Sequence, residues 1–371
     1  MASEFSLAIY PWVFVSQWTG ATWDHRYEEK PHSTPEQEAA LPDAEREALF
    51  LERNRFADLP LVNYTTQYGM GCFEGLKAFP QPDGSLKLFR PADNGARMAR
   101  SMEGLHMPTF PIEGFVDAVR GVVARNQEIG FAPAYDSAWE ADDFASGASV
   151  YVRPFSYAEG GIGVNLSRFP YFIIVTTRVG SYFAPGESSP TGTTRRVRAT
   201  PGGTGWIKCN SNYVTSALAK MEAEQQGFIE CVFLDAVEHR YVEEGSSCNL
   251  FFVLDDQTLA TPQLGDTVLP GITRTTVMEL AQQWGLTVEE RPVAIDEVMD
   301  RGVEFFGTGT AAGVTHFSSV THDGTEKTFG DGRMGPITQR LLRTLKGIQY
   351  GALEDTYGWM VPCASPVATA A

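Results

Sequence analysis

Short apolar runs alternate with amphipathic stretches along most of the chain. Segments rich in β-branched and aromatic residues predict strands at 86–89, 149–154, 171–177, 231–236, 240–244 and 249–254. Apolar residues recur at helical spacing in the segments 92–104, 112–130, 212–226, 273–284 and 335–350. This mixture excludes all-α and all-β architectures and predicts an α/β (α+β mixed) fold.

The first sixty residues follow a different pattern. They are polar and rich in Pro and Glu, with scattered aromatic residues such as Trp12, Trp18 and Trp23. We expect this segment to form an arm that packs over the main body of the protein.

The chain of 371 residues is longer than a single hydrophobic core usually grows, so we expect two domains. Residues 182–192 combine Pro, Gly and Ser, which is the composition of a linker or loop. The sequence therefore predicts a small N-terminal domain with its arm over 1–181, a linker over 182–193 and a large C-terminal domain over 194–371.

Composition and charge restrict the class of partner. Hydrophobic residues make up 43% and charged residues 20% of the chain, as in ordinary folded proteins. The net charge of −17 repels phosphate backbones and anionic lipids, so nucleic acid and membrane surfaces are not expected partners. The longest apolar runs, at 171–176 and 250–254, are far shorter than the roughly 20 residues of a membrane span.

The cysteines indicate a reducing compartment. Five are present, namely Cys72, Cys209, Cys231, Cys248 and Cys363, and they show no metal-ligand spacing. The first residues lack a basic segment followed by an apolar core, so we expect no secretory signal. A cytoplasmic protein with free thiols and no metal is predicted, and a processed mitochondrial form remains an alternative.

One lysine has an unusual setting. The segment 204–213, TGWIKCNSNY, places Lys208 among glycine, apolar and small residues just before a predicted helix. Taken alone, this residue would more often be an ordinary surface lysine. Desolvation near a helix N-terminus would lower the pKa of its amine, and a neutral amine is required to form a Schiff base with an aldehyde.

The lysine segment resembles the motif of fold-type IV, pyridoxal-phosphate-dependent aminotransferases, in which a tyrosine, here Tyr213, follows the lysine five residues later. Residues 68–79, YGMGCFEGLKAF, are similar to the signature of the branched-chain amino acid aminotransferases of this class IV family. Residues 89–98, FRPADNGARM, resemble a further run of that group. The resemblance covers about 61–315 and implies two domains with pyridoxal 5′-phosphate in the cleft between them.

The resemblance also implies cofactor-binding residues: Arg90, Lys208, Tyr213, Glu244, Ile272, Thr273 and Thr310. Lys208 would be the catalytic residue, and Arg90 would grip the cofactor phosphate because a guanidinium pairs with phosphate oxygens. Residues 269–274, LPGITR, open a helix whose free N–H groups suit an anion. Glu244 would pair with the pyridine nitrogen, although Glu243 remains an alternative because a one-residue shift exchanges the faces of a strand.

The same resemblance implies a substrate pocket, formed by Tyr68, Phe73, Tyr151, Arg153, Thr310 and Ala311. Aromatic surface suits the side chain of Leu, Ile or Val. The implied activity is transfer of the amino group of branched-chain L-amino acids to 2-oxoglutarate in two half-reactions, with ping-pong kinetics and Lys208 moving the α-proton. Members of the family are homodimers or larger, so a homodimer is expected.

Some positions depart from the family pattern. Gln67 stands where many members have histidine, and residues 209–211, CNS, replace a stretch that is usually richer in glycine. The sequence at 313–316, GVTH, lacks the Cys-x-x-Cys pair of some animal members, so a thiol switch is not expected there. Alternatives are a relative acting on secondary-metabolite amino acids, D-amino acids or amines, an aminodeoxychorismate lyase, or a non-catalytic protein that retains the fold.

Overall fold

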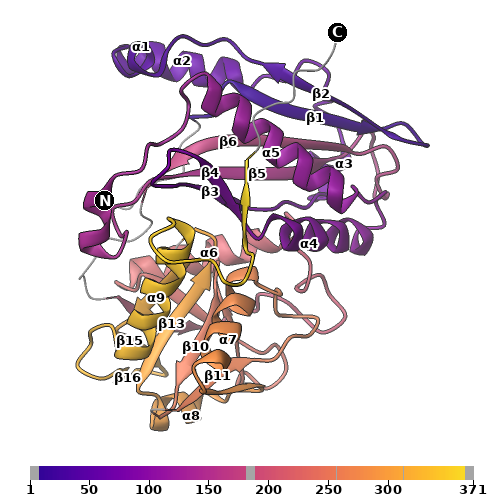
Figure 1. Cartoon of the computed structure of the whole chain (residues 1–371). Helices are drawn as coiled ribbons and strands as arrows, with labels where there is room; N and C mark the ends of the chain where they lie inside the picture. The colour runs from indigo at the N-terminus through magenta and orange to yellow at the C-terminus, as the bar shows by residue number, and fades with distance from the viewer. Residues whose placement is uncertain (1–7, 181–188, 256, 312, 364–371) are drawn as a thin grey trace. The chain divides into compact units, whose positions relative to one another are not determined.

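The chain folds into two compact units with mixed α/β structure, as predicted (Figure 1). The computed structural model describes residues 8–180, 189–255, 257–311 and 313–363. Unit 1 comprises Met1–Tyr182 together with Gly347–Ala371, and unit 2 comprises Phe183–Lys346.

Unit 1 is built on one antiparallel sheet with the strand order β17-β4-β3-β5-β6-β1-β2. Its strands are β1 (Trp12–Trp18), β2 (Trp23–Glu29), β3 (Leu76–Pro80), β4 (Leu86–Phe89), β5 (Ser149–Tyr157), β6 (Tyr171–Val179) and β17 (Met360–Pro362). Every residue of β3 is buried, which makes this strand part of the interior of the unit.

Unit 1 also contains five α-helices and a 3₁₀ turn among the described residues. They are α1 (Pro35–Ala39), α2 (Asp43–Arg53), α3 (Tyr64–Tyr68), α4 (Pro91–Gly104), α5 (Ile112–Glu128) and the 3₁₀ turn η1 (Ser137–Asp142). Helix α5 crosses the sheet over β1, β5 and β6 (Figure 1). It buries Phe115, Val119 and Val122 because these residues recur at helical spacing on one face.

The prediction of an N-terminal arm is wrong, because this segment contributes strands to the sheet of unit 1. Strand β1 lies between β6 and β2 and is paired along its length with β2. Its residues Val13, Phe14 and Val15 are buried, since they occupy both faces of a strand inside the sheet. The polar composition of the flanking helices α1 and α2 concealed this short apolar run.

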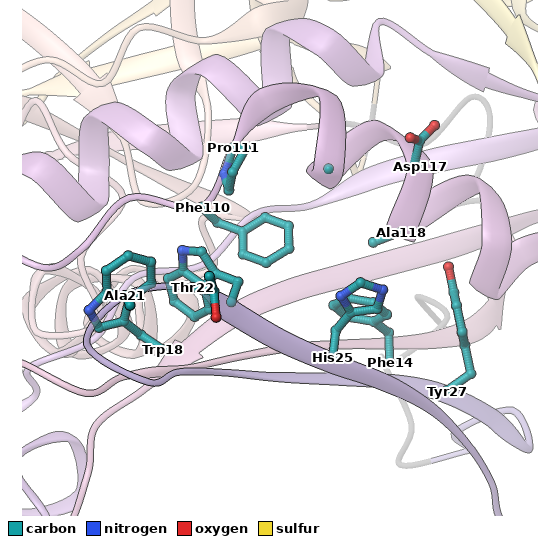
Figure 2. Close-up of a pocket in the computed structure, with 12 residues that line it drawn as sticks. Phe14, Trp18, Ala21, Thr22, His25, Tyr27, Phe110, Pro111, Asp117 and Ala118 are labelled. Atoms are coloured by element: carbon teal, nitrogen blue, oxygen red, sulfur yellow. The ribbon is translucent and has the colours of Figure 1, made fainter.

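The β1–β2 hairpin and the start of α5 line a partly open cavity of about 490 Å³, and many of the lining side chains are aromatic (Figure 2). Phe110 stacks on Phe172 of β6 with ring centroids 4.1 Å apart, and Trp23 meets Phe110 edge to face. The Trp23 indole N–H donates to the backbone oxygen of Thr109. These contacts attach the hairpin to the helix that covers the sheet.

The division into units differs from the predicted domains at the C-terminus. Strand β17 pairs with β4, with Met360 opposite Phe89, so the described residues from 347 to 363 belong to unit 1. Unit 1 is consequently the larger unit in residues, not the smaller one. A pairing between strands so distant in sequence leaves no local signal. Of the predicted linker, 182–188 lie outside the described residues, and β7 (Pro190–Thr194) is a strand of unit 2.

Unit 2 contains a mixed sheet with the order β12-β11-β10-β9-β8-β7-β15-β16, and β13 pairs with β10 and β14. Its strands after β7 are β8 (Glu230–Leu234), β9 (Val242–Gly245), β10 (Asn249–Val253), β11 (Thr258–Pro262), β12 (Thr287–Arg291), β13 (Glu304–Gly309), β14 (Gly313–Phe317), β15 (Ser319–His322) and β16 (Thr325–Thr328). Phe252, Phe305 and Phe317 lie at the centre of its core. The predicted meander of three consecutive strands is confirmed as β8, β9 and β10.

The remaining helices are α6 (Asn212–Gln225), α7 (Ile272–Gln283), α8 (Ile295–Arg301) and α9 (Pro336–Gln349). Helix α6 buries only small side chains, Ser216, Ala219 and Ala223, in its contact with β7 and β8. Its large apolar residues, Val214, Leu218 and Met221, are exposed. The helical spacing predicted α6 correctly, but the apolar stripe faces away from the core of its own unit.

Candidate active site

Lys208 lies in the loop that leads from β7 into α6. The Asn212 side chain closes this loop, because its Nδ2 donates to the backbone oxygens of Thr204 at 2.7 Å and Ile207 at 3.0 Å. The Thr204 hydroxyl donates back to Asn212 Oδ1 at 2.7 Å. The loop therefore holds the lysine in a defined position just before the first turn of the helix.

The side chains of Lys208 and Tyr213 meet. Lys208 Nζ donates to the Tyr213 hydroxyl at 2.6 Å, and both residues are partly buried. Tyr213 stands in the first turn of α6, so the helix fixes the partner of the amine. The structure thus brings together the two residues that the lysine motif paired.

Glu244 on β9 is a buried acid of this unit. Its carboxylate accepts the backbone N–H of Leu269 at 3.1 Å and Nδ2 of Asn249 at 3.2 Å, and it forms an ion pair with Arg198 at 2.6 Å. Burial raises the pKa of the Glu244 carboxyl, while the charge of Arg198 is the strongest opposing effect and that of Lys208 also opposes it. The acid therefore lies within the electrostatic reach of the candidate catalytic lysine.

The neighbouring Glu243 has a different environment. It is buried, and its Oε2 has no hydrogen-bond partner among the described residues. Burial raises the pKa of the Glu243 carboxyl to about 7, against a hydrogen bond from Thr267 that lowers it. Glu244 has three polar partners, namely Leu269, Asn249 and Arg198, which favours Glu244 rather than Glu243 as the acid of the site.

The Glu243 carboxyl makes a pH-dependent contribution to stability. Its folded-state pKa of about 7 exceeds the ordinary 4.5, so the folded chain binds this proton more tightly than the unfolded chain. Its stabilising contribution is complete below about pH 4.5 and is lost as pH rises through about 7. We expect Glu243→Gln to raise the thermal midpoint at pH 8 and to have a smaller effect at pH 5. Calorimetry checks this, and an equal gain at both pH values would contradict it.

The first turn of α7 is open to an anion. Its N-cap is Gly271, with φ −72° and ψ 135°, and no side chain of the described residues caps the helix. The N–H groups of Ile272 and Thr273 consequently lack partners within the helix. A Cβ atom at Gly271 would lie 2.0 Å from Asn249 Oδ1, so the close approach of these two segments requires glycine. Such a helix start suits a phosphate group.

Thr310 and Ala311 follow the end of β13, and both are partly buried. The adjacent Thr308 is buried, and its hydroxyl has no hydrogen-bond partner among the described residues. An unpartnered buried hydroxyl is costly unless something else satisfies it. Thr308 is therefore a polar position of this region that the sequence did not single out.

Arg90 stands in unit 1 at the N-cap of α4, with a left-handed φ of 47°. Its side chain is only 11% exposed, and its Nε donates to Asp93 Oδ2 at 2.5 Å. The guanidinium lies over the ring of Trp359 at 5.3 Å, and the Arg90 N–H donates to the Trp359 backbone oxygen. The first turn of α4 and a segment near the C-terminus thus fix the orientation of this arginine.

A buried ion pair connects the two motifs of unit 1. Glu74 is fully buried and accepts bonds from Arg97 Nε at 2.7 Å and Nη2 at 2.8 Å. Asn94 Nδ2 donates to the same carboxylate at 2.7 Å. Because Arg97 and Asn94 belong to α4, Glu74 fixes the 73–79 motif against the helix that Arg90 begins.

Tyr151 and Arg153 project from β5. Arg153 Nη2 donates to the Tyr151 hydroxyl at 2.8 Å, and its guanidinium lies over the Phe73 ring at 4.7 Å. Arg153 Nε is buried without a hydrogen-bond partner among the described residues. Tyr68, in α3, is more exposed and accepts the Gly163 N–H at 3.1 Å. Phe73, Tyr151 and Arg153 therefore form one cluster that combines aromatic surface with a positive charge.

Gly75 provides the space that Tyr151 occupies. A Cβ atom at Gly75 would lie 2.1 Å from the Tyr151 hydroxyl oxygen. We expect Gly75→Ala to displace this ring and so lower kcat/KM, and to destabilise the fold by about 1–3 kcal/mol because it overpacks the core. Steady-state kinetics measures the effect. Gly180→Ala is the control, since a Cβ atom there meets no atom of the described residues within 4 Å, and equal rates for both variants would refute the expectation.

The predicted residues divide between the units. Unit 1 holds Tyr68, Phe73, Arg90, Tyr151 and Arg153, while unit 2 holds Lys208, Tyr213, Glu244, Ile272, Thr273, Thr310 and Ala311. Arg198, which pairs with Glu244, was not foreseen, because nothing distinguishes it from its neighbours Arg195 and Arg196 in the sequence. The unusual Gln67 holds a loop, since its Nε2 donates to the Gly161 backbone oxygen at 3.0 Å.

Unit 2 thus combines the partly buried amine of Lys208, the buried acid Glu244 and the open N-terminus of α7. These features and the mixed α/β architecture indicate the class of protein. The family described as "Amino-transferase class IV" matches residues 71–320, which is more than half of the chain. The chain belongs to this family.

Similar proteins within the family have more specific names. The chain is 40% identical over 304 residues to a branched-chain-amino-acid aminotransferase of Mycolicibacterium smegmatis, covering 79% of this chain and 80% of that protein. It is 37% identical over 303 residues to the branched-chain-amino-acid transaminase 1 of Bacillus subtilis, covering 79% and 82%.

Solved structures agree with these relatives. The Escherichia coli branched-chain amino acid aminotransferase aligns with a TM-score of 0.70 and 28% identity, covering 83% of this chain and 95% of that chain. A second branched-chain amino acid aminotransferase, from T.th. and with pyridoxamine 5′-phosphate, aligns with a TM-score of 0.71 and 28% identity, covering 83% and 94%.

Proposed function

We propose that the chain is a pyridoxal-phosphate-dependent transaminase that moves the amino group of branched-chain L-amino acids to 2-oxoglutarate. The observation that carries the proposal is the arrangement in unit 2, where the Lys208 amine meets Tyr213 and lies in the field of the buried Glu244. The family membership and the names of the relatives support the same activity.

The residues present fit pyridoxal 5′-phosphate at its aldehyde, its pyridine nitrogen and its phosphate. The Lys208 amine suits its aldehyde, and the Glu244 carboxylate suits its pyridine nitrogen. The open N-terminus of α7, with the N–H groups of Ile272 and Thr273, suits its phosphate. Arg90 and Thr310 are proposed as further phosphate ligands. When bound, the cofactor supplies an aldehyde that bonds to amino groups and a ring that accepts electrons.

Lys208 has two tasks in this proposal. Its Nζ would hold the aldehyde carbon of the cofactor, and the same amine in its free form would take the proton from the substrate α-carbon. Tyr213 accepts a hydrogen bond from this nitrogen at 2.6 Å and so limits its orientation. Glu244 provides a negative charge in a buried position, where it stabilises positive charge more strongly than it would in water.

The substrate would contact both apolar aromatic residues and a positively charged residue. Phe73 and Tyr68 offer apolar surface for a branched side chain. Arg153, whose Nε is buried without a partner among the described residues, offers charge to a carboxylate, which 2-oxoglutarate and glutamate carry on their side chains. Thr310 and Ala311 are proposed to bind the carboxylate that all these substrates share.

The proposal is tested by the absorption of the purified protein between about 300 and 500 nm, where the bound cofactor absorbs. We expect a visible band that L-leucine shifts toward the ultraviolet and that 2-oxoglutarate restores. D-Leucine and simple amines are added to separate samples in the same absorption experiment. A band that responds to these but not to L-leucine would identify a relative with shifted specificity. No band after supply of the cofactor would overturn the enzyme assignment.

We also propose that the chain forms a homodimer through exposed apolar surface in both units. In unit 1 the exposed apolar residues are Leu61, Val62, Ile162, Val164, Leu166 and Phe169. In unit 2 they form the outer stripe of α6, namely Val214, Leu218 and Met221. Exposed patches of this kind are typical of interfaces. Sedimentation of wild type and of Val164→Asp tests this, and a monomeric wild type would contradict it.

We further propose that the protein resides in the cytoplasm. All five cysteines are free thiols in the structure, which fits a reducing compartment. Across the described residues, no helix combines the length and the apolar character needed to cross a membrane. Fractionation of cells, with detection of the chain in each fraction, tests the assignment.

A further inference from the structure

Arg198 is a buried arginine in the segment between β7 and the Lys208 loop. Its side chain is 6% exposed, and one nitrogen, Nη2, makes three polar contacts. This nitrogen pairs with Glu244 Oε1 at 2.6 Å and donates to the backbone oxygens of Gly205, at 3.0 Å, and Thr267.

Each of these partners belongs to a different part of the candidate cofactor site. Gly205 lies in the loop that carries Lys208, and Glu244 is the acid of the site. Thr267 begins the segment that leads through Gly271 into the open turn of α7. A Cβ atom at Gly205 would lie 2.7 Å from the Thr267 Cα atom, so the two backbone segments are in close contact beside the guanidinium.

Asn249 provides a second link between Glu244 and the segment that precedes α7. Its Nδ2 donates to the Leu269 backbone oxygen at 2.8 Å and to Glu244 Oε2 at 3.2 Å. Leu269 returns a bond from its N–H to the same carboxylate oxygen. Arg198 and Asn249 therefore hold opposite oxygens of Glu244, and both also bind the segment that precedes α7.

Packing alone does not account for an arginine at this position. Its Nε is buried without a hydrogen-bond partner among the described residues, which costs free energy. A buried ion pair is also often no more stable than an apolar pair of similar size. What Arg198 does supply is a positive charge against Glu244, where it is the strongest effect that lowers the pKa of this carboxyl.

We propose that Arg198 is a positioning residue of the cofactor site, which pairs with Glu244 and holds the lysine loop, the acid and the phosphate-binding turn in one arrangement. This inference rests on the proposed function, because it concerns the site for pyridoxal phosphate. Arg198 itself is not assigned a contact with cofactor or substrate.

The test compares Arg198→Met and Arg198→Lys with a matched control, Arg53→Met. Arg53 is equally buried in unit 1, and it too binds one carboxylate, Glu38, and two backbone oxygens, those of Pro31 and Ile9. The dissociation constant of pyridoxal phosphate is measured by titrating each apo-protein, and thermal unfolding of the apo-proteins reports stability separately.

We expect Arg198→Met to weaken cofactor binding about 10–100-fold, as loss of a residue that orients a ligand does elsewhere. Arg198→Lys should recover part of the affinity because it keeps the charge. Arg53→Met should lower the unfolding temperature at least as much, with the dissociation constant unchanged. If both Met variants weaken cofactor binding equally, Arg198 is merely structural and the inference is wrong.

The pH dependence separates charge from packing. The charged or titratable groups that act on Glu244, or on which Glu244 acts, are Arg198, Lys208, Glu243, Arg274 and Cys248. Without Arg198 the carboxyl ionises at higher pH, so the affinity of Arg198→Met should recover as pH rises, relative to wild type at the same pH. A defect that is constant with pH would overturn the electrostatic role.

A double variant provides the last comparison. In the Glu244→Gln background, Arg198→Met should cause little further loss of affinity, because the charge that Arg198 supports is already absent. Additive losses would contradict the inference. If wild type itself binds no pyridoxal phosphate, the proposed function fails instead, and this outcome is distinct from a wild type that binds and an Arg198→Met variant that binds equally well.

Discussion

Replacement of Lys208 by alanine is expected to reduce the rate of amino transfer about 10⁴-fold or more. The variant loses both the amine that holds the cofactor and the base that takes the α-proton, and these two tasks fall on one atom. Tyr213, whose hydroxyl lies 2.6 Å from that atom, cannot replace it because a phenol forms no Schiff base with an aldehyde. Stopped-time assays with L-leucine and 2-oxoglutarate measure the rate.

The control for this experiment is Lys220→Ala. Lys220 lies in α6, is about one-third exposed and faces Glu224 at 3.9 Å, so its loss should leave the rate close to that of wild type. Lys208→Ala should still bind pyridoxal phosphate, since the other proposed ligands remain, but without the visible band. A variant that retains the band and the rate would exclude Lys208 as the catalytic residue.

Replacement of Glu244 by glutamine is expected to have the second largest effect, a loss of about 10²–10³-fold in kcat. Glutamine fills the same space and can accept the Leu269 N–H, but it carries no charge to hold the pyridine nitrogen in its protonated form. The substitution also leaves Arg198 without a countercharge in a buried position. Unpaired buried charges of this kind cost about 3–5 kcal/mol, so the unfolding temperature should fall as well.

Glu243→Gln is the matched control, because it makes the same substitution one residue away on the same strand. Its kcat should stay close to that of wild type. If Glu243→Gln were the more damaging variant, the assignment of the acid would move to Glu243. Should Glu244→Gln prove too unstable to assay, Arg198→Met combined with Glu244→Gln removes both charges and relieves the unpaired one, and its kcat should remain low.

The sequence predicted many of the secondary-structure elements closely, and it did so where the signals are local. Helix α5 was expected over 112–130 and spans Ile112–Glu128, while β4 was expected over 86–89 and spans Leu86–Phe89. The sequence failed where a segment depends on distant partners. The apolar run in β1 becomes a strand inside the sheet only because β6 accepts it.

The candidate site shows the same contrast. Lys208 and Tyr213 are five residues apart, so their meeting at the start of α6 follows from the motif itself. Arg198 lies far from Glu244 in sequence, and no pattern indicated that its guanidinium would turn toward the acid. The sequence preferred Glu244 and left Glu243 as an alternative, whereas the bonds of Glu244 to Asn249 and Leu269 come from other segments and leave no local signal.

The pairing of β17 with β4 has a consequence for biosynthesis. A ribosome releases the chain from its N-terminus, so β4 remains an open sheet edge until residues near Met360 have emerged. Trp359, which covers the Arg90 guanidinium and accepts its backbone N–H, arrives at the same late moment. Unit 1 can therefore complete its sheet, and fix Arg90, only after all of unit 2 has been synthesised.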